Sequence, residues 1–159
     1  MMTTNHPTSI TAQPGVPFVD IVREFSAPPS AVYRAHIDPS LFAQWTGPRS
    51  MTMQDVVLEA RPGGRWYYAF RCQGDMLCTF SGYFHAVEPN TLLIQTFEFN
   101  LAPGQVGIGT TRFEAIDGGT RMTVHEVYPS VEARDAAVSS GMESGIVEGY
   151  EQLDEVLAG

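Results

Sequence analysis

The sequence predicts an α+β fold in which one long C-terminal helix lies across a curved antiparallel sheet. After Gly47-Pro48 the chain repeats strand patterns separated by turn signals. From Val131 to Leu157 the apolar residues instead recur at steps of three or four, the period of a helix with one buried stripe. The stripe consists of Val138, Met142, Ile146, Tyr150, Leu153 and Leu157. Because only the sheet remains to bury this stripe, we expect the helix to cross the sheet and to enclose a pocket.

Length and composition favour one domain over residues 16–159. Chains of 159 residues form a single core, and the hydrophobic share of 43% is enough for one. Residues 1–15 are rich in Thr, Ser, Asn, Gln and Pro and contain little to bury, so we expect them to be a disordered N-terminal tail.

The charge of the chain argues against two classes of partner. Eighteen acidic residues against nine basic ones give a net charge of -9, which repels a phosphate backbone and an anionic lipid surface. We therefore expect neither nucleic-acid binding nor membrane docking. No apolar run approaches the roughly 20 residues that span a bilayer, and the N-terminus lacks the regions of a secretion signal. We expect a cytoplasmic protein.

A strand and two short helices come first. Val19–Phe25 has the pattern of a strand, and the prolines of Ala27-Pro28-Pro29 end it because they remove ladder donors. Proline suits a helix start, so residues 30–37 predict a short helix. Asp38 can cap a second short helix that runs through Trp45.

A meander of about six strands follows, with one strongly aromatic face. Its turn signals are Pro62-Gly63-Gly64, Gly74-Asp75, Pro89-Asn90, Pro103-Gly104 and Gly118-Gly119. Trp66, Tyr68 and Phe70 alternate with their neighbours and therefore share one face of a strand. Phe97 and Phe99 repeat the pattern two strands later.

Short motifs recur in a fixed order over nearly the whole domain. The first are Arg23-Glu24-Phe25, Ala27-Pro28-Pro29, Val32-Tyr33-Arg34-Ala35, Asp38-Pro39, Leu41, Trp45 and Gly47-Pro48. The later ones are Arg61-Pro62-Gly63-Gly64-Arg65-Trp66, Ser81-Gly82-Tyr83, Gly119-Thr120-Arg121-Met122 and Gly141-Met142, which leads to Leu153. In order and spacing, these motifs resemble the heat-shock-protein ATPase activator homologue-like family.

The resemblance implies the helix-grip fold of the START-like superfamily, with a curved antiparallel sheet of about six or seven strands, two short helices and a long C-terminal helix over the sheet. It also implies a cavity between sheet and helix that binds a small hydrophobic or amphipathic molecule. The family shares no catalytic residue set, so we expect no catalytic residue, no cofactor and no metal. Chaperone activation does not follow from the family's name.

Aromatic and apolar side chains are the candidates for lining this cavity, since aromatic rings give large contact areas and Trp or Tyr adds one directed donor. The candidates are Trp45, Trp66, Tyr68, Phe70, Phe97, Phe99, Phe113, Met142, Ile146 and Tyr150. For any single aromatic residue, core packing is the simpler interpretation. The whole set exceeds what filling a core requires.

Glu126 is the candidate for the polar end of the ligand, together with Tyr150. It continues an apolar register, so it or Glu98 is expected to point into the cavity, with Arg23 as its partner. His125 then points to the opposite face. The competing interpretation places these charges on solvent-facing positions.

Gly141, Gly145 and Gly149 form a stripe without side chains on the terminal helix. The stripe either leaves space for a ligand or permits close backbone packing on the sheet or on a second subunit.

Cys72 and Cys78 flank a short hairpin loop that places them opposite each other. A reducing compartment favours two free thiols over a disulfide.

Two other functions remain open, and a homodimer is compatible with all of them. A cyclase or dehydratase acting on a polyketide-like or aromatic substrate needs two titratable groups that converge in the pocket. A chaperone-associated or homodimeric interaction module needs an exposed apolar patch and no internal void. The sequence contains no nucleophile elbow and no phosphate-binding loop.

Overall fold

The computed structural model describes residues 6–72 and 74–159, and in them eight strands form one antiparallel sheet accompanied by four helices. The strands are β1 (Thr8–Thr11), β2 (Phe18–Phe25), β3 (Met53–Leu58), β4 (Arg65–Arg71), β5 (Leu77–Glu88), β6 (Leu92–Phe99), β7 (Gly107–Ile116) and β8 (Gly119–Val127). The helices are α1 (Pro29–Ile37), α2 (Pro39–Trp45), α3 (Val131–Ser139) and α4 (Met142–Ala158). This arrangement confirms the predicted α+β helix-grip fold.

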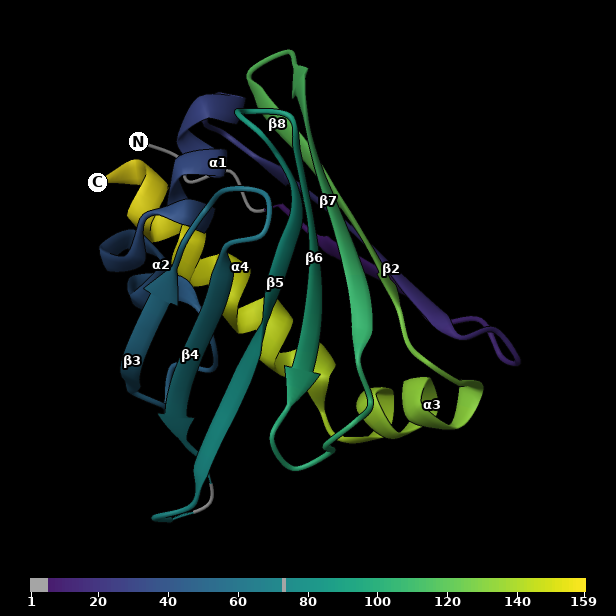
Figure 1. Ribbon diagram of the computed structural model, residues 1–159. Helices are drawn as coiled ribbons and strands as arrows, with labels where there is room; N and C mark the ends of the chain where they lie inside the picture. Colours follow the sequence, from purple (N-terminus) through teal and green to yellow (C-terminus); the bar gives the residue numbers. More distant parts are fainter. Residues whose placement is uncertain (1–5, 73) are drawn as a thin grey trace.

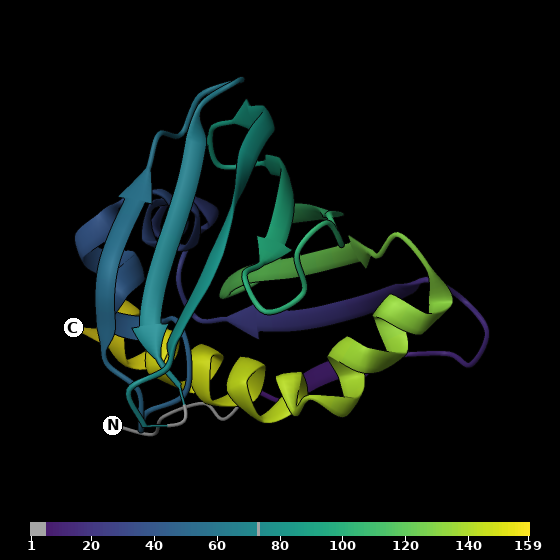
Figure 2. The ribbon, with the colours of Figure 1, turned by 60° about the horizontal axis from the view of Figure 1, so that its bottom comes forward.

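The strands follow the order β1-β2-β8-β7-β6-β5-β4-β3, so β3 to β8 form the predicted meander and β2 joins it through β8. The pairing shifts register between Phe84 and Ala86 of β5 and between Met53 and Asp55 of β3, and such bulges bend a sheet. Figures 1 and 2 show α1, α2 and α4 against one side of the curved sheet. We call this side the inner face.

The strand β1 raises the strand count above the predicted six or seven. The sequence predicts a disordered tail over residues 1–15, but the structure pairs Thr8–Thr11 with β2, with Ile10 opposite Ile21. Residues 1–5 lie outside the described residues. Ladder hydrogen bonds to β2 stabilise this edge strand. Its apolar side chain Ile10 also packs against the core. A long-range ladder and a single apolar residue are weak signals in a polar segment, so composition alone does not predict β1.

Asp38 separates α1 from α2, as the sequence predicts. Its carboxylate accepts hydrogen bonds from the backbone N–H groups of Ser40 and Leu41, at 3.0 and 3.4 Å, and so caps α2. Pro29 lies in the first turn of α1, where a missing N–H costs nothing. The side that α1 buries consists of Val32, Tyr33 and Ala35.

The predicted terminal helix is divided into α3 and α4. Gly141 between them has a φ of 89°, in the left-handed region that favours glycine. The apolar pattern continues through this turn, so periodicity predicts one helix over Val131–Leu157 where the structure has two. Val138 of α3 is 37% exposed, and the buried stripe therefore begins at Met142.

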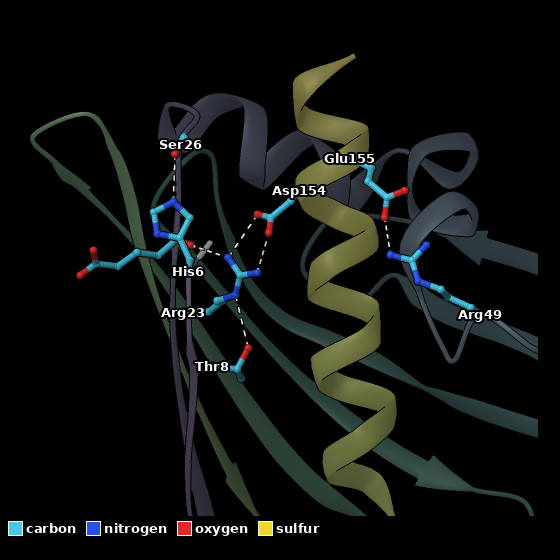
Figure 3. Close-up of polar contacts among 8 residues, drawn as sticks. His6, Thr8, Arg23, Ser26, Arg49, Asp154 and Glu155 are labelled. Atoms are coloured by element: carbon cyan, nitrogen blue, oxygen red, sulfur yellow. Dashed lines mark hydrogen bonds and ion pairs between the residues drawn. The ribbon is translucent and has the colours of Figure 1, made fainter. Parts of the chain in front are cut away.

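Two contacts fix α4 to the sheet. Leu153 is fully buried, and the guanidinium of Arg23, only 1% exposed, donates to both carboxylate oxygens of Asp154, at 3.1 and 2.6 Å. Figure 3 shows Arg23 between Asp154 and Thr8, whose Oγ1 accepts a further hydrogen bond at 3.3 Å. On the other side of the helix, Glu155 forms an exposed ion pair with Arg49. Strand β1 and helix α4 are thus joined through one buried arginine.

Cys72 and Cys78 form a disulfide across the β4–β5 hairpin, with their Cα atoms 5.8 Å apart. The expectation of two free thiols is wrong for this structure. The backbone N–H of Cys72 donates to the carbonyl of Met76 at 2.9 Å, and this turn brings the two cysteines together. The expectation rested on the compartment, whereas local hairpin geometry decides the pairing.

Candidate functional site

The inner face of the sheet has a closed part and a more open part. In the closed part the side chains are buried, among them Phe25, Trp66, Phe84, Phe113, Met122 and Leu153. In the other part, inner-face residues of the sheet and residues of α4 are only half-buried: Tyr68, Phe70, Phe80, Phe97, Phe99, Glu126, Tyr128, Met142 and Ile146. We call the seven of these residues that lie outside α4, from Tyr68 to Tyr128, the aromatic face. Water reaches them even though they belong to the side of the sheet that α4 covers.

Stacked rings make a continuous surface across β4, β5 and β6. Tyr68 stacks with Phe80 at a centroid distance of 5.4 Å, and Phe80 with Phe99 at 4.7 Å. Phe70 continues the row at 6.2 Å from Phe80, and Trp66 at 5.8 Å from Tyr68 connects it to the closed core. The arrangement offers a broad apolar surface suited to a flat or ring-containing molecule. The sequence interpretation missed Phe80, although its spacing of two residues from Cys78 and Gly82 places the three on one face of a strand.

Glu126 places a carboxylate on this aromatic surface. It lies on β8 directly opposite Val19 and Gly109, so it shares the inner face as the sequence predicts. The hydroxyl of Tyr128 donates to Glu126 Oε2 at 3.2 Å and lies 3.8 Å from the sulfur of Met142. The ring of Phe97 packs edge-on against Tyr128 at 5.3 Å. The predicted residues Glu126, Phe97 and Met142 therefore meet around Tyr128, which the sequence interpretation did not include among the site residues.

The charge of Glu126 acts on three tyrosines. Burial raises the pKa of the Glu126 carboxyl, while the hydrogen bond from Tyr128 opposes this shift. Burial also raises the pKa values of Tyr68, Tyr128 and Tyr150, and the negative charge of Glu126 raises all three further. These phenols come from β4, from the segment after β8 and from α4. Among the hydrogen bonds of the described residues, none involves the hydroxyl of Tyr68 or Tyr150.

Gly109 leaves room beside the carboxylate. A methyl group added at this position would approach no atom closer than 3.9 Å, with the carbonyl of Gln95 and the ring of Phe97 as its neighbours. An ordinary van der Waals contact lies at this distance, so the missing side chain leaves a gap on the inner face next to Glu126.

Several candidates lie away from this face. Trp45 donates its indole N–H to the carbonyl of Ala35 at 2.9 Å, inside the closed core, and Phe113 is 5% exposed between Tyr33 and His36. Tyr150 is buried between Phe25 and Trp45 at the border of the two parts. The structure therefore divides the predicted lining into buried core residues and half-buried residues of the aromatic face and α4.

One predicted polar contact is wrong, and one of the two alternative carboxylates does not lie on the inner face. Arg23 does not pair with Glu126, because Asp154 takes its guanidinium. Glu98 lies on the outer face, where it accepts a hydrogen bond from the N–H of Gly104 at 2.8 Å. His125 also lies on the outer face, 2.6 Å from Asp20, so the predicted opposition of His125 and Glu126 is confirmed.

The glycine stripe of α4 supports close packing rather than ligand space. A Cβ on Gly149 would lie 3.2 Å from the carbonyl of Trp45, and one on Gly145 would lie 3.7 Å from the ring of Pro48. Gly141 forms the turn before the helix. Gly145 and Gly149 therefore face the end of α2 and the segment that follows it, an alternative that the sequence interpretation did not contain.

Open surface hollows occur elsewhere on the molecule. One of about 430 Å³ is lined by Ser50, Met51, Thr52, Gln54, Arg71, Cys72 and Gly74, and one of about 400 Å³ by Ser30, Ala31, Arg34, Ala35, Leu41, Val156 and Leu157. Neither contains a residue of the aromatic face. Within residues 6–72 and 74–159, no three His, Cys, Asp or Glu side chains gather as metal ligands, and no helix has the length and apolarity to cross a membrane.

The sequence matches the model of a known family. The family model described as "Activator of Hsp90 ATPase homolog 1-like protein" matches residues 26–158. The chain belongs to this family. It matches no curated protein significantly.

Solved structures of several bacterial proteins are similar to this AHSA1-like chain over nearly its whole length. A Rhodobacter sphaeroides protein has a TM-score of 0.88 at 26% identity, over 96% of this chain and 99% of its own. Protein Ms6760 of Mycobacterium smegmatis has a TM-score of 0.85 at 25% identity, over 95% and 97%. An Arthrobacter aurescens protein has a TM-score of 0.83 at 25% identity, over 94% and 91%. The fold and the family's general role as a ligand-binding module are therefore supported.

Replacing Glu126 with Gln is expected to stabilise this AHSA1-like protein at neutral pH. The folded state holds the Glu126 proton more tightly than the unfolded state, whose carboxyl titrates near 4.5. Stability is therefore lost as pH rises from about 4.5 through the raised pKa of the folded state. Thermal unfolding should give a higher midpoint for Glu126→Gln at pH 7 and a smaller difference from the wild type at pH 4. Equal midpoints at pH 7 would contradict the partial burial of this carboxyl.

Proposed function

We propose that this chain, as a single domain over residues 16–159, binds a small hydrophobic or amphipathic molecule between its aromatic face and α4. The observation that supports this most strongly is the partial exposure of stacked rings on the covered side of the sheet. A sheet face that only fills a core would be sealed like the part around Phe25 and Leu153. Aromatic surfaces with a few directed polar groups are typical of small-molecule sites.

Glu126 and the hydroxyls of Tyr68 and Tyr150 would bind the polar end of the molecule. The rings of Phe70, Phe80 and Phe99 would cover its apolar body, and Met142 and Ile146 would close the site from α4. These side chains are partly exposed before binding and would be fully buried in the complex. Removing this apolar area from water would supply the binding free energy.

Titration with the neutral fluorescent probe 1-N-phenylnaphthylamine tests this proposal. Its emission rises in apolar surroundings, and its fused and single rings match the stacked rings of the site. We expect a saturable rise that a single site per chain describes and that disappears when the protein is unfolded. A rise that stays linear with probe concentration would argue for nonspecific association and against a binding site.

A reaction on a polyketide-like or aromatic substrate is the second candidate, because Glu126 and Tyr128 are two titratable groups in contact. Binding is the better-supported function. Arg23 is held by Asp154 and His125 lies on the outer face, so neither supplies a second acid or base beside Glu126.

We propose the cytoplasm as the location of the protein, on the basis of the sequence. The Cys72–Cys78 disulfide is the observation that opposes this, since disulfides persist mainly in oxidising compartments. A homodimer is a further proposal, compatible with the exposed apolar residues Leu101, Val106 and Ile108 around the β6–β7 connection.

A further inference from the structure

Glu126 is a carboxylate without a cationic partner. None of the ion pairs among the described residues includes it. The nine basic residues of the chain are all arginines. The two buried ones are engaged elsewhere: Arg23 with Asp154, and Arg134 with Asp135 and the carbonyl of Gln13. Only the hydroxyl of Tyr128 donates to the carboxylate in the hydrogen bonds of the described residues. Its remaining acceptor positions are therefore available to a ligand.

The surroundings of Glu126 suit a cation better than an anion. The rings of Phe97 and Tyr128 lie beside it, and the faces of aromatic rings attract positive charge. Gly109, opposite Glu126, keeps the space next to the carboxylate open. A ligand carboxylate would meet the charge of Glu126, which no arginine among the described residues pairs with. The net charge of -9 adds long-range repulsion of anions.

Resting on the proposed function, we propose that the bound molecule carries a protonated amine on an aromatic or hydrophobic body, and that Glu126 binds this amine beside the rings of Phe97 and Tyr128. The stacked rings from Tyr68 to Phe99 hold the body. The positive charge of the amine offsets the cost of a partly buried carboxylate that has no cationic partner among the described residues.

Three matched probes test the charge preference: 3-phenylpropylamine, 3-phenylpropan-1-ol and 3-phenylpropanoate, each used to displace 1-N-phenylnaphthylamine at pH 7. The three share one body and differ in the charge of the end group. We expect the amine to bind about tenfold more tightly than the alcohol, because a charge-assisted contact in a partly buried site exceeds a neutral one. The carboxylate should bind most weakly.

The variant Glu126→Gln separates charge from shape. It should bring the amine to the affinity of the alcohol, because the amide still accepts a hydrogen bond but carries no charge. Glu98→Gln is the control, since it changes the net charge equally but lies on the outer face. An amine preference that persists in Glu126→Gln would overturn this proposal.

The outcomes also separate this proposal from the proposed function. Equal binding of the three probes by the wild type would refute the amine preference and leave the binding site in place. The same conclusion would follow if 1-N-phenylnaphthylamine binds saturably and none of the three probes displaces it. Failure of 1-N-phenylnaphthylamine to bind would instead remove the site on which the inference rests.

Discussion

Replacing Asp154 with Asn should destabilise the protein by about 3 kcal/mol, because it leaves a buried guanidinium without its counter-charge. Arg23 is 1% exposed and donates to both oxygens of Asp154, and its guanidinium carbon lies 4.9 Å from the centre of the Phe25 ring. The asparagine keeps the shape of the side chain but not its charge. Urea unfolding at pH 7 measures the loss.

The neighbouring residue supplies the control. Glu155 pairs with Arg49 on the exposed side of the same helix, as Figure 3 shows. Glu155→Gln removes the same charge from α4, and we expect no measurable change in the unfolding midpoint because exposed ion pairs contribute little. Equal losses for the two variants would mean that the Arg23–Asp154 pair is not buried as described.

Replacing Gly82 with Ala should also destabilise the protein by about 3 kcal/mol, through overpacking and the loss of a buried hydrogen bond. A methyl group there would overlap the carbonyl of Thr96 and lie 2.7 Å from the indole nitrogen of Trp66. That nitrogen donates to the same carbonyl at 2.8 Å. The glycine of the Ser81-Gly82-Tyr83 motif thus lets β5 and β6 close over the indole.

The same substitution at Gly109 is the matched control for Gly82→Ala. Gly109 also lies on the inner face, but the nearest atom to an added methyl group is 3.9 Å away. Gly109→Ala should leave the free energy of unfolding unchanged or raise it by about 0.5 kcal/mol, since alanine restricts the unfolded chain. Chemical unfolding of both variants under one condition makes the comparison, and similar losses would contradict the gap beside Glu126.

The order of elements was predictable because each has a local signal. Pro28, Pro29 and Asp38 mark the helix boundaries, and the paired turn residues mark the meander. The inward direction of Glu126 was also predictable, because side chains alternate along a strand and its register continues from Met122 and Val124. Edge strand β1 lacked such a signal, since its pairing with β2 depends on a long-range ladder.

Which residues form the site was less predictable, because tertiary packing decides which side chains lie together. Alternation assigns Trp66, Tyr68 and Phe70 to one face, but the burial of Trp66 and the partial exposure of Tyr68 follow from where α2 and α4 cross the sheet. Asp154 as the partner of Arg23 requires the position of α4. Gly141 supplies a local turn signal, which the continuous apolar period concealed.

Titration of Gly109→Leu with 1-N-phenylnaphthylamine, beside the wild type and Gly109→Ala, tests the binding site most directly. Leucine at this position would project into the gap next to Glu126, so probe affinity should fall by about tenfold or more while alanine preserves it. Thermal unfolding of the same samples verifies that all three are folded. An unchanged probe affinity in folded Gly109→Leu would contradict a ligand site between the aromatic face and α4.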